Sequence, residues 1–137
     1  LPVQIALSDA DTSLSVVSYA GLVLFVIGIF FEAVGDWQLA QFKRNPNSSG
    51  QVMQTGLWKY TRHPNYFGDT CVWWGIGVVA LGASFGWVGL FGSLLMNFFL
   101  VRVSGVPMLE RSMSKRRPGY DEYKRRTSSF VPRPPKK

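Results

Sequence analysis

The chain has 137 residues, of which 47% are hydrophobic and 15% aromatic, while only 17% are charged. A charged fraction near one quarter is usual for a soluble domain, so this composition argues against one. The length favours a single unit, a membrane domain covering residues 1–137. With one histidine and one cysteine, a zinc site of the His/Cys kind is close to excluded, and we expect no metal site.

The chain begins at Leu1 rather than at a methionine, and no signal-peptide pattern precedes the first apolar stretch. We therefore expect the C-terminal half of a larger bundle, or a processed protein. Residues 12–31 carry no charge and match the roughly 20 residues that cross a bilayer. The helix is predicted to continue through Glu32 and Asp36 to about Ala40, before a dense turn signal at residues 45–50.

A second uncharged stretch, residues 70–101, is too long for one crossing. As a single helix it would measure roughly 48 Å, against a hydrocarbon core of about 30 Å. Residues 82–86 offer a turn, and a hairpin places the basic loop and the basic tail on the same side, as the positive-inside rule prefers. The prediction is an all-α membrane bundle with three spans, near residues 13–40, 65–82 and 87–108.

The expected topology is multi-pass, with the acidic N-terminus outside and the basic loop and C-terminus in the cytoplasm. Trp37 and Trp58 are then expected at the inner membrane interface and Trp87 at the outer one. Pro107 is predicted to kink or end the third span. A short amphipathic cytoplasmic helix over residues 110–126, broken at Pro118-Gly119, and an extended tail follow.

The net charge of +7 lies mostly in the C-terminal segment, where residues 110–137 hold ten cations and three acids. A basic tail can bind nucleic acid. Because this one follows apolar spans, we expect it to orient the protein in the lipid bilayer and to meet anionic headgroups. No nucleic-acid partner is expected. The many glycines form no dinucleotide fingerprint, and close packing of helices is the better interpretation.

The densest group of reactive side chains lies in residues 56–69, GLWKYTRHPNYFGD. Pro64 suits the first turn of a helix, whose free amides can bind an anion between Arg62 and His63. His63 could titrate near neutral pH, or make a structural hydrogen bond. The ionisable residues near the spans all fall at the cytoplasmic end: Glu32, Asp36, Asp69, Arg102 and Glu110. Either they form an anion-binding pocket there, or they are interface residues that snorkel or pair. The two carboxylates on the first span repel and need donors such as Lys43 or Arg62.

These blocks resemble a known family. The segment 56–69, preceded by FEAVGDWQLAQFK (31–43) and followed by SGVPMLE (104–110) and RRPGYDEY (116–123), is similar to an uncharacterised bacterial membrane-protein family grouped with the C-terminal domain of steroid 5α-reductases. A looser similarity, through the R-H-P-x-Y-x-G block of residues 62–68, extends to isoprenylcysteine carboxyl methyltransferases and phospholipid methyltransferases.

The resemblance implies a cytoplasmic site for NADPH, as in the reductases, or for S-adenosylmethionine, as in the methyltransferases. Asp36 would meet a ribose or amide, Lys43 and Arg62 the phosphates, and Tyr66 is the candidate proton donor. Asp69 stands where the reductases carry a glutamate. Residues 107–110 stand where they carry histidines, which argues against a steroid. The cofactor-binding residues implied are Asp36, Lys43, Arg62, His63, Asn65, Tyr66, Asp69 and Arg102.

Three functions follow from these observations. The first is an NADPH-dependent reductase of a C=C bond in a steroid- or lipid-like hydrophobic substrate. The second is an S-adenosylmethionine-dependent methyltransferase acting on a lipid or isoprenoid. The third is a non-catalytic membrane subunit that keeps the fold within a larger complex with other membrane subunits. The sequence favours the first.

Overall fold

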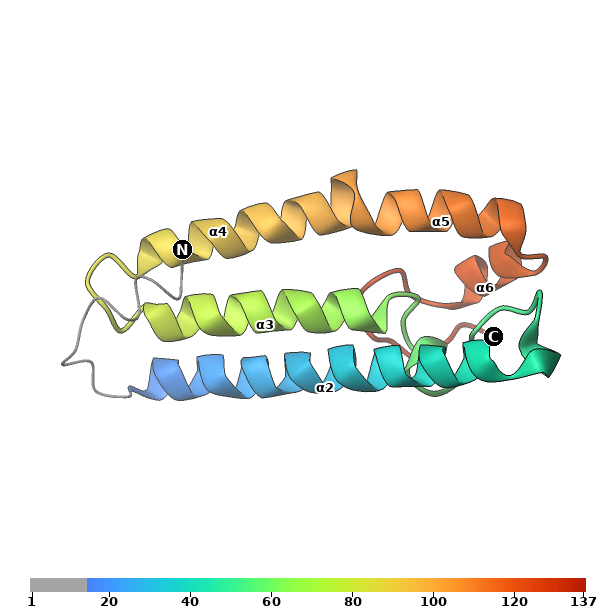
Figure 1. The fold of residues 1–137 in the computed structure, drawn as a ribbon. Coiled ribbons are helices and arrows are strands. Elements are labelled where there is room, and N and C mark those ends of the chain that lie inside the picture. The colour runs from blue at the N-terminus through green and yellow to red at the C-terminus, as the bar shows by residue number, and fades with distance from the viewer. Residues whose placement is uncertain (1–14) are drawn as a thin grey trace.

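The computed structural model describes residues 15–137, which form an all-helical bundle (Figure 1). Within this range there is no β-strand, only an isolated bridge between Thr61 and Ser128. The all-α prediction is confirmed. The acidic segment with Asp9 and Asp11, and the first two residues of the first predicted span, lie outside the described residues.

The longest helix, α2 (Val16–Arg44), begins with a serine cap, in which the Ser15 hydroxyl accepts a hydrogen bond from the Ser18 amide at 3.2 Å. The predicted end at Ala40 was four residues too early. Nothing in residues 40–44 disfavours a helix, so α2 continues until the sequence Asn45-Pro46. There the chain turns into the short 3₁₀ helix η1 (Pro46–Ser48).

Helices α3 (Pro64–Ala80) and α4 (Trp87–Phe98) form the predicted hairpin, and α3 lies between α2 and α4 (Figure 1). Pro64 occupies the first turn of α3, as predicted. The turn over residues 81–86 is so tight that a Cβ on Gly86 would lie 1.9 Å from the Ala80 carbonyl oxygen. A glycine is therefore required at this position.

Helices α2 and α3 meet along a seam of glycines spaced seven residues apart, Gly21 and Gly28 on α2 facing Gly75 and Gly68 on α3. A Cβ on Gly28 would lie 2.6 Å from the Gly68 carbonyl oxygen, and one on Gly21 would lie 2.7 Å from that of Gly75. The helices touch backbone to backbone, which a side chain would prevent. The interpretation of these glycines as helix-packing positions is confirmed.

The third predicted span is not a single helix to residue 108. After α4 the chain forms a π-helical segment, η3 (Phe99–Val103), in which the Ser104 amide bonds to the Phe99 carbonyl at 2.9 Å. It then resumes as α5 (Gly105–Arg116). In a regular helix the Pro107 ring would clash with the preceding turn, so the irregularity falls just before it rather than at it. The surface helix predicted from residue 110 therefore begins at Gly105.

The remaining C-terminal helix, α6 (Tyr120–Arg126), follows the predicted break at Pro118-Gly119, and an extended tail completes the chain. Between α2 and α3 lies a second 3₁₀ helix, η2 (Gly56–Lys59). Trp58 is buried, and its indole N–H donates to the Gly35 carbonyl at 3.1 Å. It therefore packs η2 onto α2, and its position at the membrane interface stays a prediction. Trp37 and Trp87 are exposed.

Two helical stretches within residues 15–137 are long and apolar enough to cross a membrane, Val16–Arg44 and Trp87–Arg116. Large apolar side chains point outward from both, among them Val23, Phe91 and Phe98. Exposed apolar surface on this scale is unusual for a soluble monomer and supports a membrane protein. The 17 residues of α3 would extend about 26 Å, which is near the thickness of the hydrocarbon core.

Candidate functional site

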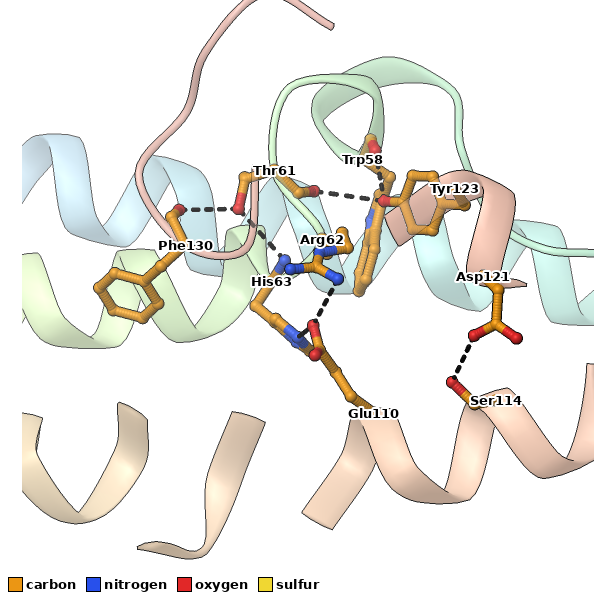
Figure 2. A network of polar contacts seen from close by, with 9 residues as sticks. All are labelled: Trp58, Thr61, Arg62, His63, Glu110, Ser114, Asp121, Tyr123 and Phe130. Carbon is orange, nitrogen blue, oxygen red and sulfur yellow. Dashed lines mark hydrogen bonds and ion pairs between the residues drawn. The ribbon is translucent and has the colours of Figure 1, made fainter. Parts of the chain in front are cut away.

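The loop that precedes α3 is held in place by the C-terminal segment (Figure 2). The Thr61 hydroxyl donates to the Phe130 carbonyl at 2.7 Å, and the Arg62 amide donates to the Ser128 carbonyl at 2.9 Å. The Tyr123 hydroxyl donates to the Trp58 carbonyl. Residues about 65 positions apart in the chain thereby fix the backbone that carries Arg62 and His63.

A buried ion cluster lies at the start of α3 (Figure 2). One carboxylate oxygen of Glu110, on α5, is 3.1 Å from Arg62 Nη1 and 3.0 Å from His63 Nε2. The side chains of Arg62 and His63 are 10% and 1% exposed. Removing charges from water is costly unless they are paired, so the cluster depends on all three groups. Arg62 Nε and His63 Nδ1 are buried and have no hydrogen-bond partner within residues 15–137.

These two side chains line a mostly apolar pocket of about 130 Å³ between the end of α2, the loop before η2, and helices α5 and α6. Its apolar and aromatic wall is formed by Leu39, Phe42, Val52, Met53, Trp58, Leu109, Met113, Tyr120 and Tyr123. Lys43 and Arg117 also line it. The pocket thus combines an apolar wall with the cations Lys43, Arg62 and Arg117 and the imidazole ring of His63.

Lys43 and Arg117 also line an adjoining hollow of about 210 Å³ beside η1, and therefore lie between this hollow and the apolar pocket. Neither cation forms an ion pair with a carboxylate in the described part of the chain, where the ion pairs involve Arg62, His63, Arg125 and Arg126. Two cations without carboxylate partners beside an apolar pocket could bind an anionic group.

The tyrosines of this region are unusually poor acids. Burial raises the pKa of Tyr120 to about 12, with a smaller contribution from the charge of Glu110. Burial also raises the pKa of Tyr123. Their rings are in contact, with centroids 5.7 Å apart, as expected for two residues on one helical face. Both hydroxyl groups therefore remain neutral throughout the physiological pH range.

A second polar group lies on the α2–α3 face. The side-chain amide of Asn65 donates to the Asp36 carboxylate at 3.0 Å, and its oxygen accepts a hydrogen bond from the Tyr66 backbone N–H at 3.0 Å. The charges of Asp36 and Asp69 act on the carboxyl group of Glu32, so three carboxylates gather at this face. The expected donors for Glu32 and Asp36 were groups such as Lys43, Arg62 or a ligand hydroxyl. The structure instead gives Asp36 an amide donor, because Glu110 takes Arg62.

Tyr66 and Arg102 are the remaining predicted site residues. The Tyr66 ring stacks on the ring of His63, with centroids 5.6 Å apart. Arg102 is exposed on the π-helical segment and forms no ion pair with a described residue. The structure therefore brings together Asp36, Asn65 and Asp69 on one face and Lys43, Arg62 and His63 around the pocket.

Sequence reasoning missed the roles of Tyr123, Thr61 and Arg117, and it did not pair Glu110 with Arg62 and His63. A buried histidine and arginine need a carboxylate, and Glu110 was one of the few acids expected at the same end of the bundle. That requirement could have identified the pair. Nothing in the sequence indicated that Arg117, rather than Arg62, would remain without an acidic partner. Within residues 15–137, no group of three or more His, Cys, Asp or Glu side chains is placed to hold a metal ion.

Residues 1–127 match the family described as "Protein of unknown function (DUF1295)", and the chain belongs to that family. The family is part of the superfamily of steroid 5α-reductase-like and isoprenylcysteine methyltransferase-like proteins, which confirms the resemblance drawn from the sequence blocks. No solved structure matches the chain.

Three curated relatives have related sequences. The probable O-methyltransferase ustE of Ustilaginoidea virens is 30% identical over 98 residues, covering 70% of this chain and 32% of that protein. Steroid 5-alpha-reductase DET2 of Gossypium hirsutum is 33% identical over 76 residues, covering 56% and 28%. The nickel-cobalt-cadmium resistance protein NccN of Alcaligenes xylosoxydans xylosoxydans is 29% identical over 117 residues, covering 85% and 52%. The chain thus spans between about a quarter and a half of the length of these relatives.

Proposed function

We propose that the protein is a membrane-embedded, NADPH-dependent reductase of a C=C bond in a steroid- or lipid-like substrate. The observation that carries the proposal is the pair of cations, Lys43 and Arg117, that line the pocket and form no ion pair with a carboxylate among residues 15–137. A dinucleotide bears phosphates that such a pair can bind, whereas S-adenosylmethionine bears none. The similarity to a steroid 5-alpha-reductase supports the same choice.

The pocket fits one part of such a cofactor. Its volume of about 130 Å³ is below the roughly 300–1,000 Å³ of sites that enclose a whole ligand, so it would hold one end of the molecule. Phosphates would lie between Lys43 and Arg117. The partnerless nitrogens of Arg62 and His63 would bond to polar atoms of the bound group.

The other residues have roles at the reacting end. NADPH, when bound, would supply the hydride that adds to one carbon of the double bond. Tyr66 would donate the proton to the other carbon, and His63, stacked on its ring, would hold it in position. Asp36, Asn65 and Asp69 would bind a ribose or an amide, with Arg102 reaching the cofactor from η3. The glycine-packed helices would keep the hydrophobic substrate at the membrane.

Titration of the purified protein in lipid nanodiscs with NADPH and with S-adenosylmethionine tests the proposal. Each charge-assisted bond to a phosphate contributes about 1.5–3 kcal/mol. Lys43→Ala and Arg117→Ala should therefore each weaken NADPH binding about ten- to a hundredfold. Lys115→Ala, which removes an exposed cation of the same basic segment, should leave binding unchanged. Arg62→Ala is a poorer probe, because it also removes the ion-pair partner of Glu110.

A second candidate is an S-adenosylmethionine-dependent methyltransferase of a lipid or isoprenoid. It is favoured by the similarity to a probable O-methyltransferase, which covers more of this chain than the reductase match does. Tight S-adenosylmethionine binding without NADPH binding, unaffected by Lys43→Ala, would decide for the methyltransferase. Binding of neither cofactor would favour a non-catalytic membrane subunit.

A further inference from the structure

A second, strongly basic cavity lies apart from the proposed cofactor pocket, between the end of α6 and the C-terminal tail. Its volume is about 430 Å³. Five cations line it, Lys124, Arg125, Arg126, Arg133 and Lys136, and no acidic residue does. Nothing in the proposed reaction uses these side chains.

The cavity is only partly neutralised by neighbouring acids. Glu122 pairs with Arg125 and lies 3.7 Å from Arg126, but these side chains are about half exposed or more, so the pairs are screened by water. Lys124, Arg133 and Lys136 form no ion pair with a described residue. The cavity is therefore a cationic space that favours an anionic occupant.

The backbone holds this arrangement in place, although the segment has little regular structure. The Lys136 amide donates to the Arg126 carbonyl at 2.9 Å, which folds the tail back over the end of α6. The Arg133 amide donates to the Tyr60 carbonyl at 3.0 Å, which ties the tail to the loop before α3. These bonds use backbone atoms and leave the charged ends of Arg133 and Lys136 available to a ligand, whereas the Arg126 guanidinium donates to the Gln54 side-chain oxygen at 3.4 Å.

Aromatic contacts show where the cavity lies relative to the apolar part of the bundle. Phe130, which lines the cavity, packs against Phe67 on α3 with ring centroids 5.9 Å apart, and Phe67 packs against Phe31 on α2 at 5.0 Å. The outward-facing apolar side chains of α2 run from Val16 to Phe30, followed by Trp37. The cavity thus borders the end of the lipid-facing surface, where headgroups would lie.

We infer that this cavity binds the phosphate of an anionic phospholipid headgroup. The cations would contact the phosphate, and Phe130 with the half-exposed Val131 would adjoin the start of the acyl chains. The basic end of the bundle would then be fixed to the cytoplasmic leaflet by a specific lipid as well as by its overall charge. This inference does not depend on the proposed reductase function.

Native mass spectrometry of the detergent-purified protein, titrated with dioleoylphosphatidylglycerol or dioleoylphosphatidylcholine, tests the inference. The wild type should bind the anionic lipid at least tenfold more tightly than the zwitterionic one. A triple variant, Arg126→Ala, Arg133→Ala and Lys136→Ala, should lose about a hundredfold in affinity for the anionic lipid, as the removal of three surface cations predicts. A matched control, Arg111→Ala, Lys115→Ala and Arg116→Ala, changes the net charge equally but lies outside the cavity.

These outcomes distinguish binding in the cavity from attraction to the overall positive charge of the protein. Equal losses in the two triple variants, or equal affinity of the wild type for the two lipids, would overturn the inference. Displacement of the anionic lipid by millimolar inorganic phosphate or by NADPH would also overturn it, because the occupant would then be a soluble anion. The double variant Arg133→Ala and Lys136→Ala leaves α6 intact and should still lose affinity about thirtyfold, which guards against a folding defect in the triple variant.

Discussion

Two regions of the bundle are held together in opposite ways. Along the seam of α2 and α3, Gly28 meets Gly68 and the contact requires that no side chain be present. At the polar end, before α3 begins, Glu110, Arg62 and Tyr123 join segments far apart in the chain through hydrogen bonds and ion pairs. The seam depends on close contact between backbones, so adding a side-chain atom there should destabilise the fold. The polar end depends on hydrogen bonds and ion pairs, so removing one partner there should destabilise it.

The largest expected effect is at the polar end. Glu110→Ala leaves Arg62 and His63 buried without their carboxylate and should lower the free energy of unfolding by about 3–5 kcal/mol. The matched control is Glu122→Ala, which breaks exposed ion pairs and should cost at most about 1 kcal/mol. Thermal unfolding in detergent measures both changes. Similar costs for the two variants would show that the cluster is not a structural centre.

Hydrogen exchange in Glu110→Ala should show which part of the bundle depends on the polar cluster. Because Glu110 reaches only the loop before α3, the amides of residues 56–63 should exchange faster while those of the seam on α2 and α3 remain protected. Uniformly faster exchange would mean that the two ends unfold as one unit.

The next largest effect is expected at the seam. Gly28→Ala would stabilise an ordinary helix by about 1 kcal/mol, yet here the new methyl group would lie 2.6 Å from backbone atoms of α3 that cannot rotate away. We expect a loss of about 3 kcal/mol, at the upper end of the usual cost of overpacking. Ala33→Leu, on the exposed side of the same helix, should change stability by no more than about 0.5 kcal/mol. A rise in melting temperature for Gly28→Ala would refute the close seam.

The smallest effect concerns pH at the polar end. The pKa of Tyr120 is raised to about 12, so the folded state keeps its proton above the pH at which the unfolded state, with an ordinary pKa near 10, loses it. The Tyr120 hydroxyl should therefore add no pH dependence to stability below about pH 9 and should lower stability between about pH 10 and 12, by up to about 2.7 kcal/mol. Tyr120→Phe should be nearly neutral at pH 7 and should reduce this fall. An unchanged pH profile in that variant would exclude Tyr120 as the cause.

Much of the helical framework could be predicted because its signals are local. An uncharged stretch of the right length predicts α2, Pro64 at a first turn predicts the start of α3, and the length of the second uncharged stretch predicts the hairpin. The errors in the bounds have local causes as well. The end of α2 was placed at Ala40 although only Asn45-Pro46 stops it, and the helix after the π segment begins at Gly105 because Pro107 displaces the irregularity upstream.

Composition, charge and chain length were enough to predict the class of fold, the basic end of the bundle and the set of reactive residues near residues 56–69, because these properties do not depend on which segments meet. The roles of those residues depend instead on contacts between distant segments. Glu110 lies 47 residues from His63 and contacts both Arg62 and His63, whereas Lys43 and Arg117 beside the pocket have no carboxylate partner in the described part of the chain. Pairing among buried charges depends on which helices pack together, and that packing is set by the glycine seam and the C-terminal tail rather than by any local pattern.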